Sequence, residues 1–102
     1  MKPQWSDRAY ASWQEIATYI YYTFGSRIAD DYDSATNHTI NLLTAFPEMG
    51  KEEPLLRGRN HRYRSLNIDK LSKIVYYISD DVLYIADVWN TRRSEETLTY
   101  GL

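Results

Sequence analysis

Basic side chains gather in the second half of the chain, on two segments that are expected to be neighbouring strands. Arg62 and Arg64 alternate along the first segment, and Lys73 lies on the second. Cations held close together neutralise negative charge, either the phosphates of a nucleic acid or the carboxylates of a partner protein. Three cations on one side of two strands repel one another unless something negative covers them. The alternative is an ordinary solvated face of the sheet.

Polar and aromatic residues near these cations extend the candidate surface. Arg92 and Arg93 follow the third strand segment, and His61 precedes the first. His61 could carry a proton, as could the hydroxyl group of a tyrosine. Tyrosine is also enriched at protein interfaces, and the chain contains ten. The face expected to meet a partner consists of Arg62, Arg64, Lys73, Tyr77, Tyr84 and Asn90.

Two helices are predicted in the first half of the chain. Ser6 is a good N-cap, and apolar residues then recur every three or four positions up to Phe24, which is typical of a helix with one buried face. Gly25 can end this helix in the left-handed conformation, and Ser26 can cap the next. The same spacing continues until Pro47 closes the second helix. We therefore expect two antiparallel helices.

Strands are predicted in the second half. Residues 47–60 contain several prolines and glycines and no clear period, which indicates a loop. Residues 62–68, 71–79 and 82–90 are rich in Tyr, Ile and Val and are separated by short acidic turns, as in hairpins. Residues 2–5 could add an edge strand. The sequence thus predicts an α+β fold, with two N-terminal helices packed on one face of a mainly antiparallel sheet of three to four strands.

Two-residue turns between the three strands would fix their pairing. Ile68 would then lie opposite Leu71, and directly opposed residues share a face of the sheet. This register places Arg64 and Lys73 together on the face that points away from the helices. It places Asp87 on the mostly apolar face that packs against them. A slip of one residue would turn each side chain to the other face.

Asp87 stands in the middle of an apolar strand, which invites two interpretations. One is a carboxylate that pairs with Arg92, Arg93 or a backbone amide. The other is a catalytic carboxylate, but no other residue stands at a spacing that supports catalysis. The sequence therefore favours the structural interpretation.

Length and composition limit the possible classes of protein. The 102 residues form one domain, 1–102, and 43% hydrophobic with 25% charged residues is typical of a folded protein. The chain has no cysteine and two histidines, so we expect no metal and no cofactor. No apolar run has the roughly 20 residues of a membrane helix, and the N-terminus lacks a signal peptide. These features predict a cytoplasmic protein.

Charge is unevenly distributed along the chain. The net charge is -2, whereas residues 47–75 carry seven lysines and arginines against four acidic residues. A protein that binds nucleic acid through its overall charge is usually basic. Any site for a polyanion must therefore be a local patch.

The predicted order of elements resembles that of the RelE/ParE family of bacterial type II toxins. This order is two helices, a loop and three strands, the last of which ends in IADVWNTRR. The resemblance extends from QWSDRAYASW through PEMG to KIVYYISDDVLYIADVW. It implies a toxin held inactive by a cognate antitoxin. The RelE-like branch cuts messenger RNA on the ribosome, and the ParE-like branch poisons DNA gyrase.

The resemblance carries the RelE-like residues over only in part. Arg64 matches a basic position on the first strand. Lys73 matches an arginine in a motif resembling YRLVY, and Arg92 or Arg93 matches an arginine that follows the last strand. With His61, these residues are the catalytic candidates of a nuclease.

Two positions depart from the RelE-like pattern. Leu66 stands where those nucleases have a second lysine. At the position of their catalytic tyrosine this chain has Thr97, or Tyr100 if the alignment is shifted. Each phosphate contact is normally supplied by Lys or Arg, so the sequence slightly favours a gyrase-type toxin. A ribosome-dependent nuclease and an inactive member that only binds a partner are the alternatives.

Overall fold

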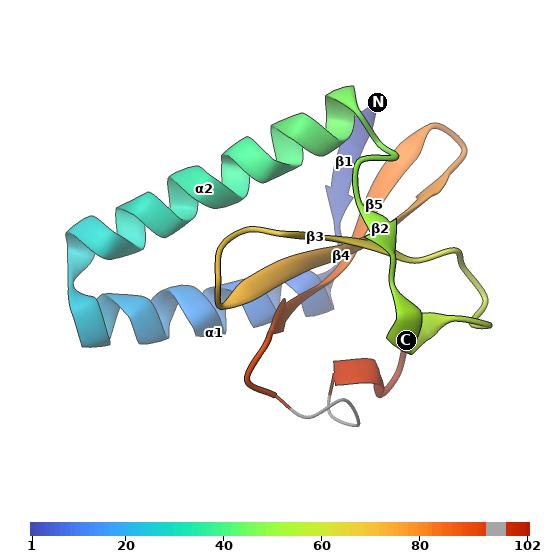
Figure 1. The fold of residues 1–102 in the computed structure, drawn as a ribbon. Helices are drawn as coiled ribbons and strands as arrows, with labels where there is room; N and C mark the ends of the chain where they lie inside the picture. Colours follow the sequence, from blue (N-terminus) through green and yellow to red (C-terminus); the bar gives the residue numbers. More distant parts are fainter. Residues whose placement is uncertain (94–97) are drawn as a thin grey trace.

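The structure, a computed structural model, describes residues 1–93 and 98–102, which form a layer of two helices against a sheet (Figure 1). The elements in chain order are β1 (Lys2–Trp5), α1 (Asp7–Phe24), α2 (Ser26–Ala45), β2 (Lys51–Glu52), the 3₁₀ turn η1 (Pro54–Leu56), β3 (Arg64–Asn67), β4 (Ser72–Ser79) and β5 (Val82–Asn90). The predicted α+β fold is confirmed. No helix among the described residues is both long enough and apolar enough to span a lipid bilayer.

The two helices lie close to their predicted bounds, but Gly25 and not Ser26 is the N-cap of α2, and no side chain caps that helix. The Ser6 hydroxyl accepts a hydrogen bond from the Ala9 amide at 2.9 Å and caps α1. Gly25, with φ of 93°, makes the sharp connection to α2. The Trp13 indole then donates to the Thr36 hydroxyl at 2.9 Å and fastens the helices together. Both helices lie on the same face of the sheet.

The sheet contains five strands in the order β1-β5-β4-β3-β2. β1 is the edge strand that the sequence predicts, and it runs parallel to β5, whereas the other neighbours are antiparallel. β2 is one strand more than predicted. Its two residues are too few to show an alternating pattern in the sequence.

The predicted register between β3 and β4 is wrong by one residue. Arg64 pairs with Tyr76, and Asn67 pairs with Lys73. The connection is longer than a two-residue turn because the Asp69 carboxylate accepts hydrogen bonds from the backbone amides of residues 71 and 72. Alternation then places Arg64 and Lys73 on opposite faces of the sheet.

A β-bulge changes the face of the residues at the end of β5. Tyr76 pairs with Ile85, but Val75 pairs with Asp87, so Ala86 is the extra residue. The hairpin turn itself has the predicted two residues, both with positive φ. Beyond the bulge Asp87 pairs with Val75 and so departs from the predicted register, although its carboxylate still contacts Arg8 and Ser12 of α1.

Each face of the sheet has its own apolar cluster. On the helix face, residues of β4 and β5 pack against α1 and α2, and burial of each Ile or Leu there contributes about 1.5 to 3 kcal/mol. We call the other side the outer face and define it by Ser65, Lys73, Val75, Tyr77, Tyr84, Asp87 and Trp89. η1 and the C-terminal residues 98–102 lie over part of it, with Leu56 and Leu98 buried there (Figure 1).

Candidate functional site

Lys73 is the predicted cation that lies on the outer face, and it is already paired. Its ammonium group forms an ion pair with Glu53 and lies 5.3 Å from the centre of the Trp89 ring. The Glu53 side chain is only 1% exposed and also accepts from the Leu55 amide at 3.1 Å and the Ser65 hydroxyl at 3.0 Å. Burial raises the pKa of Glu53, but these hydrogen bonds and the charge of Lys73 outweigh it, so the pKa lies below its usual value. The charge of Lys73 is therefore neutralised within the protein by Glu53.

Arg64 has a structural role on the opposite face. Its guanidinium donates to the carbonyl oxygens of Gly50, at 2.7 Å, and Glu48, at 3.3 Å. These bonds fasten the segment after α2 to the edge of the sheet. Arg64 and Lys73 therefore do not converge on one ligand.

The predicted residues at the end of β5 also turn toward the helices. Arg93 forms an ion pair with Glu15 of α1 at 2.8 Å. The Asn90 side chain accepts a hydrogen bond from the Arg92 amide, and both residues line a hollow beside Ile16 of α1. This group is separated from Lys73 by the thickness of the sheet.

Four aromatic rings form a cluster at the other end of the outer face. The ring of Tyr77 lies between His61, with centroids 3.8 Å apart and 7° between planes, and Tyr84, at 5.1 Å and 19°. Tyr63 meets the His61 and Tyr77 rings edge-on. His61, Tyr77 and Tyr84 remain partly exposed beside a cleft of about 310 Å³. We call His61, Tyr63, Tyr77 and Tyr84 the aromatic cluster.

Asp87 is held by a network rather than left free for chemistry. Its carboxylate accepts from the Arg8 guanidinium at 3.0 Å, the Ser12 hydroxyl at 2.7 Å and the Val88 amide at 2.8 Å. The Trp89 indole donates to it as well, at 3.1 Å. The expectation of a backbone amide partner is confirmed, whereas the arginine is Arg8 and not Arg92 or Arg93.

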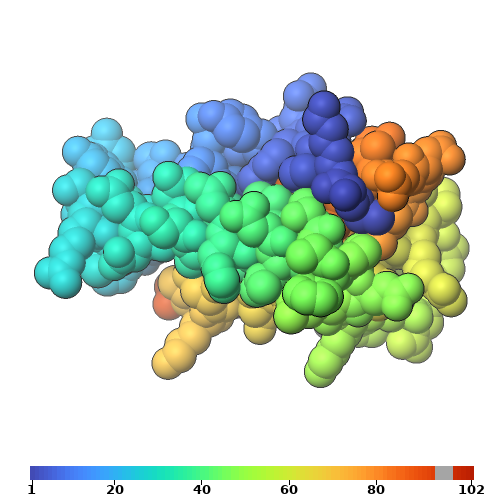
Figure 2. Space-filling model, turned by 90° about the horizontal axis from the view of Figure 1, so that it is seen from above, coloured from blue at the N-terminus to red at the C-terminus, as the bar shows by residue number. Residues whose placement is uncertain are grey.

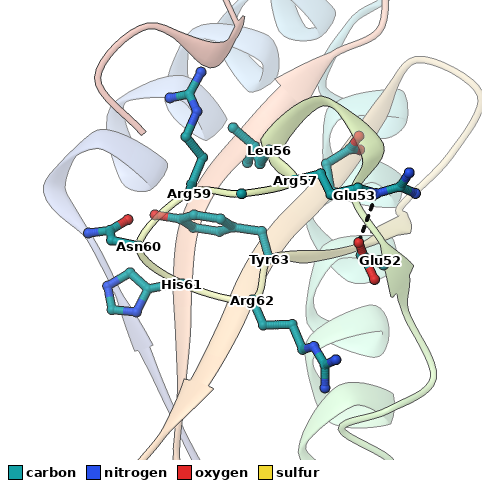
Figure 3. A pocket seen from close by; sticks show the side chains of 10 residues that line it. Glu52, Glu53, Leu56, Arg57, Arg59, Asn60, His61, Arg62 and Tyr63 are labelled. Carbon is teal, nitrogen blue, oxygen red and sulfur yellow. Dashed lines mark hydrogen bonds and ion pairs between the residues drawn. The ribbon is translucent and has the colours of Figure 1, made fainter.

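The loop before β3 carries further arginines around a hollow of about 300 Å³ (Figure 3). Arg57 pairs with Glu52 at 3.0 Å, and Arg59 donates to the carbonyl oxygens of Thr99 and Leu102. The side chains of Arg59 and Arg62 leave the loop in opposite directions (Figure 3). Within the part of the chain that the structure describes, Arg62 makes no hydrogen bond or ion pair.

The fold agrees with the comparisons to known proteins. A family model described as the ParE toxin of the type II toxin-antitoxin system, parDE, matches residues 4–95. The chain belongs to the ParE toxin family. A solved structure described as "Chromosomal ParDE TA system from P. aeruginosa" is similar, with a TM-score of 0.71 and 14% identity over 88% of this chain and 95% of that one. No curated protein matches.

The outer face of this ParE-family chain contains no convergent set of cations and proton carriers among the described residues. Lys73 and Arg8 are each neutralised by a buried carboxylate, and His61 stacks on a tyrosine. Thr97, one of the two positions aligned with a catalytic tyrosine, lies outside the described residues. The other, Tyr100, has a side chain that is 83% exposed.

Residues that sequence reasoning missed determine this arrangement. Glu53 and Arg8 neutralise Lys73 and Asp87; Glu53 lies in the loop without a clear period, and Arg8 lies on the first predicted helix, away from the strands that carry its partner. One signal was present for Glu53, because an acidic residue directly before proline is a good cap for a short helical turn. Its side chain does cap η1 in this ParE-family chain.

Proposed function

We propose that this ParE-type toxin arrests growth by acting on DNA gyrase and that a cognate antitoxin neutralises it. The observation that carries the choice of target is the separation of Arg64 and Lys73 on opposite faces, with Lys73 bound to buried Glu53. Cleavage of RNA by its own 2′-hydroxyl requires a base, an acid and cations positioned around one phosphate. The described residues supply no such group of cations, which supports a target other than messenger RNA.

The antitoxin is proposed to contact the aromatic cluster and Arg62. Tyr77, Tyr84 and His61 offer a rigid, partly exposed aromatic surface, and such residues often dominate binding energy at protein interfaces. Arg62 adds an unpaired cation nearby for an acidic residue of the partner. Because the other outer-face charges are neutralised internally, apolar contact contributes more here than charge.

Two parallel assays test the target. Purified toxin is added to a gyrase supercoiling reaction and to a translation reaction in which cuts in the message are mapped by primer extension. Inhibited supercoiling with intact message is expected. New cuts in the ribosomal A site would replace gyrase by the ribosome as the target, and no effect in either assay would indicate a protein that only binds a partner.

A separate assay tests the antitoxin surface. The toxin is co-expressed with the product of a neighbouring short reading frame, and the complex is purified and its affinity measured. Tyr84→Ala is expected to weaken the complex at least about tenfold. Tyr100→Ala removes a more exposed tyrosine outside the aromatic cluster and is the matched control. Equal affinities for the two variants would contradict this assignment, whatever the outcome with gyrase.

A further inference from the structure

The helical hairpin exposes aromatic side chains that neither the sheet nor the proposed antitoxin surface uses. Tyr22 is 82% exposed and Tyr21 is 51% exposed, and their rings meet edge-on with centroids 5.2 Å apart. Tyr10 is also half exposed and stacks against Trp13. Exposed apolar surface that is contiguous in this way usually marks a binding site.

Trp13, Tyr21 and Tyr22 line a groove between α1 and α2, and Tyr10 lies outside that lining. The helices lie side by side (Figure 2). Ala17 and Ala29 are small and half buried in the groove, with Trp13 toward one end and Tyr21 and Tyr22 toward the other. Its volume is about 410 Å³. The groove lining runs from Trp13 to Tyr22 along α1, which is about 14 Å at 1.5 Å per residue and holds between two and three turns of another helix.

Carboxylates of α2 make one side of the groove acidic. Asp30 and Asp33 line it and are exposed. Within the described residues neither carboxylate forms a hydrogen bond or an ion pair, in contrast to that of Glu15, which is paired with Arg93. None of the described residues that line the groove is basic. A ligand that fits must therefore be apolar along one side and positively charged beside it.

We propose that this groove binds a basic amphipathic helix of a partner protein. Apolar residues at every third or fourth position would pack over the two alanines and between the aromatic rings. Lysine or arginine residues flanking that stripe would reach Asp30 and Asp33 and the faces of the tyrosine rings. The chain's own helices lack the required charge because they are acidic, so charge complementarity favours a different protein over a second copy.

A designed peptide is the probe. It has about 18 residues, so that its helix is long enough to be stable and covers the whole groove, with leucine at every third or fourth position and lysine elsewhere. A peptide of the same composition in scrambled order controls for attraction by charge alone. Binding of the fluorescent peptides to the full chain is followed by anisotropy, and circular dichroism reports whether the peptide becomes helical and whether each variant remains folded.

The variants localise the binding. Tyr22→Ala and Asp33→Asn are each expected to weaken binding of the amphipathic peptide about tenfold. Asp31→Asn removes an equally exposed carboxylate that does not line the groove, and it is expected to leave the affinity unchanged. Added salt should weaken the wild-type interaction.

Three results would overturn the proposal. The first is equal binding of the scrambled peptide, and the second is an equal loss of affinity in Asp31→Asn and Asp33→Asn. The third is a concentration-dependent dimer of the free protein, measured by sedimentation, that Tyr22→Ala abolishes. That result would assign the groove to a second copy of this chain.

Discussion

At the scale of single residues, the close approach of Gly50 to Tyr76 holds the segment after α2 against the sheet. The Tyr76 hydroxyl accepts from the Gly50 amide at 3.0 Å and donates to the Pro47 carbonyl at 2.7 Å. A Cβ atom at position 50 would lie 2.5 Å from that hydroxyl and 2.9 Å from the Ser65 carbonyl oxygen. Glycine is therefore required here by space.

Gly50→Ala is expected to lower the free energy of unfolding by about 2 kcal/mol, because the tyrosine or the strand must move. Urea denaturation measures the change. In a background with Tyr76→Phe the hydroxyl oxygen that lies closest to the added methyl group is absent. Gly50→Ala should therefore lower the free energy of unfolding by less in that background. A cost that is the same in both backgrounds would contradict this explanation.

The ion pair between Glu53 and Lys73 holds a buried carboxylate in its charged form. Lys73→Met leaves a buried carboxylate without its cation and is expected to cost about 3 kcal/mol near neutral pH. The pKa of Glu53 is lowered in the wild type. Ionised Glu53 therefore stabilises the fold above the ordinary carboxyl pKa of 4.5, and this stabilisation is lost as the pH falls through the folded pKa.

In Lys73→Met, burial remains without the compensating cation, so the pKa of Glu53 should rise and protonation should relieve the penalty. Denaturation curves from pH 7 down to about pH 4 are therefore expected to show a shrinking difference between the variant and the wild type. Glu53→Gln combined with Lys73→Met should recover part of the loss at neutral pH. A difference that does not change with pH would show that the charge of Glu53 is not its cause.

At the scale of elements, the turn between β4 and β5 contains avoidable strain. Asp80 and Asp81 have φ of 50° and 64°, the left-handed region of a type I′ turn. Asp81→Gly is expected to stabilise the protein by about 0.5 kcal/mol, since glycine adopts this conformation without steric cost but loses more entropy on folding. Thermal and urea denaturation measure the change. Asp81→Ala, which keeps the Cβ atom, should not stabilise.

The two helices and the four longer strands could be predicted from the sequence, but β2, η1 and the direction of several side chains could not. Caps and apolar spacing gave α1 and α2, and alternation gave the three long strands. The faces of Arg64 and Asp87 depended instead on the Asp69 loop and on the bulge at Ala86. One extra residue reverses a face, and neither irregularity has a periodic signal. The candidate site was therefore predicted less well than the fold that carries it.

At the scale of the whole molecule, buried tyrosines limit stability in alkali. Burial raises the pKa of Tyr32 to about 12, and it also raises the pKa values of Tyr63 and Tyr76. A phenol with a folded pKa above its unfolded value of 10 stabilises the fold fully below pH 10, and that contribution is lost as the pH rises toward 12.

The free energy of unfolding should therefore fall above pH 10, by up to about 1.4 kcal/mol per pH unit for each such tyrosine. Urea denaturation at a series of pH values measures the slope. Tyr32→Phe should reduce the slope, whereas Tyr22→Phe, which changes an exposed phenol, should leave it as in the wild type. Identical slopes in both variants would contradict the role of Tyr32.

The parallel pairing of β1 with β5 joins residues 2–5 to residues 82–85, and Arg8 reaches the carbonyl oxygens of Leu98 and Tyr100. Residues 2–5 therefore have no strand partner until residues 82–85 have also left the ribosome. Contacts between such distant segments also form slowly. Synthesis and folding of this toxin are thus separated in time. A cell that synthesises it is exposed to the folded toxin only after a delay.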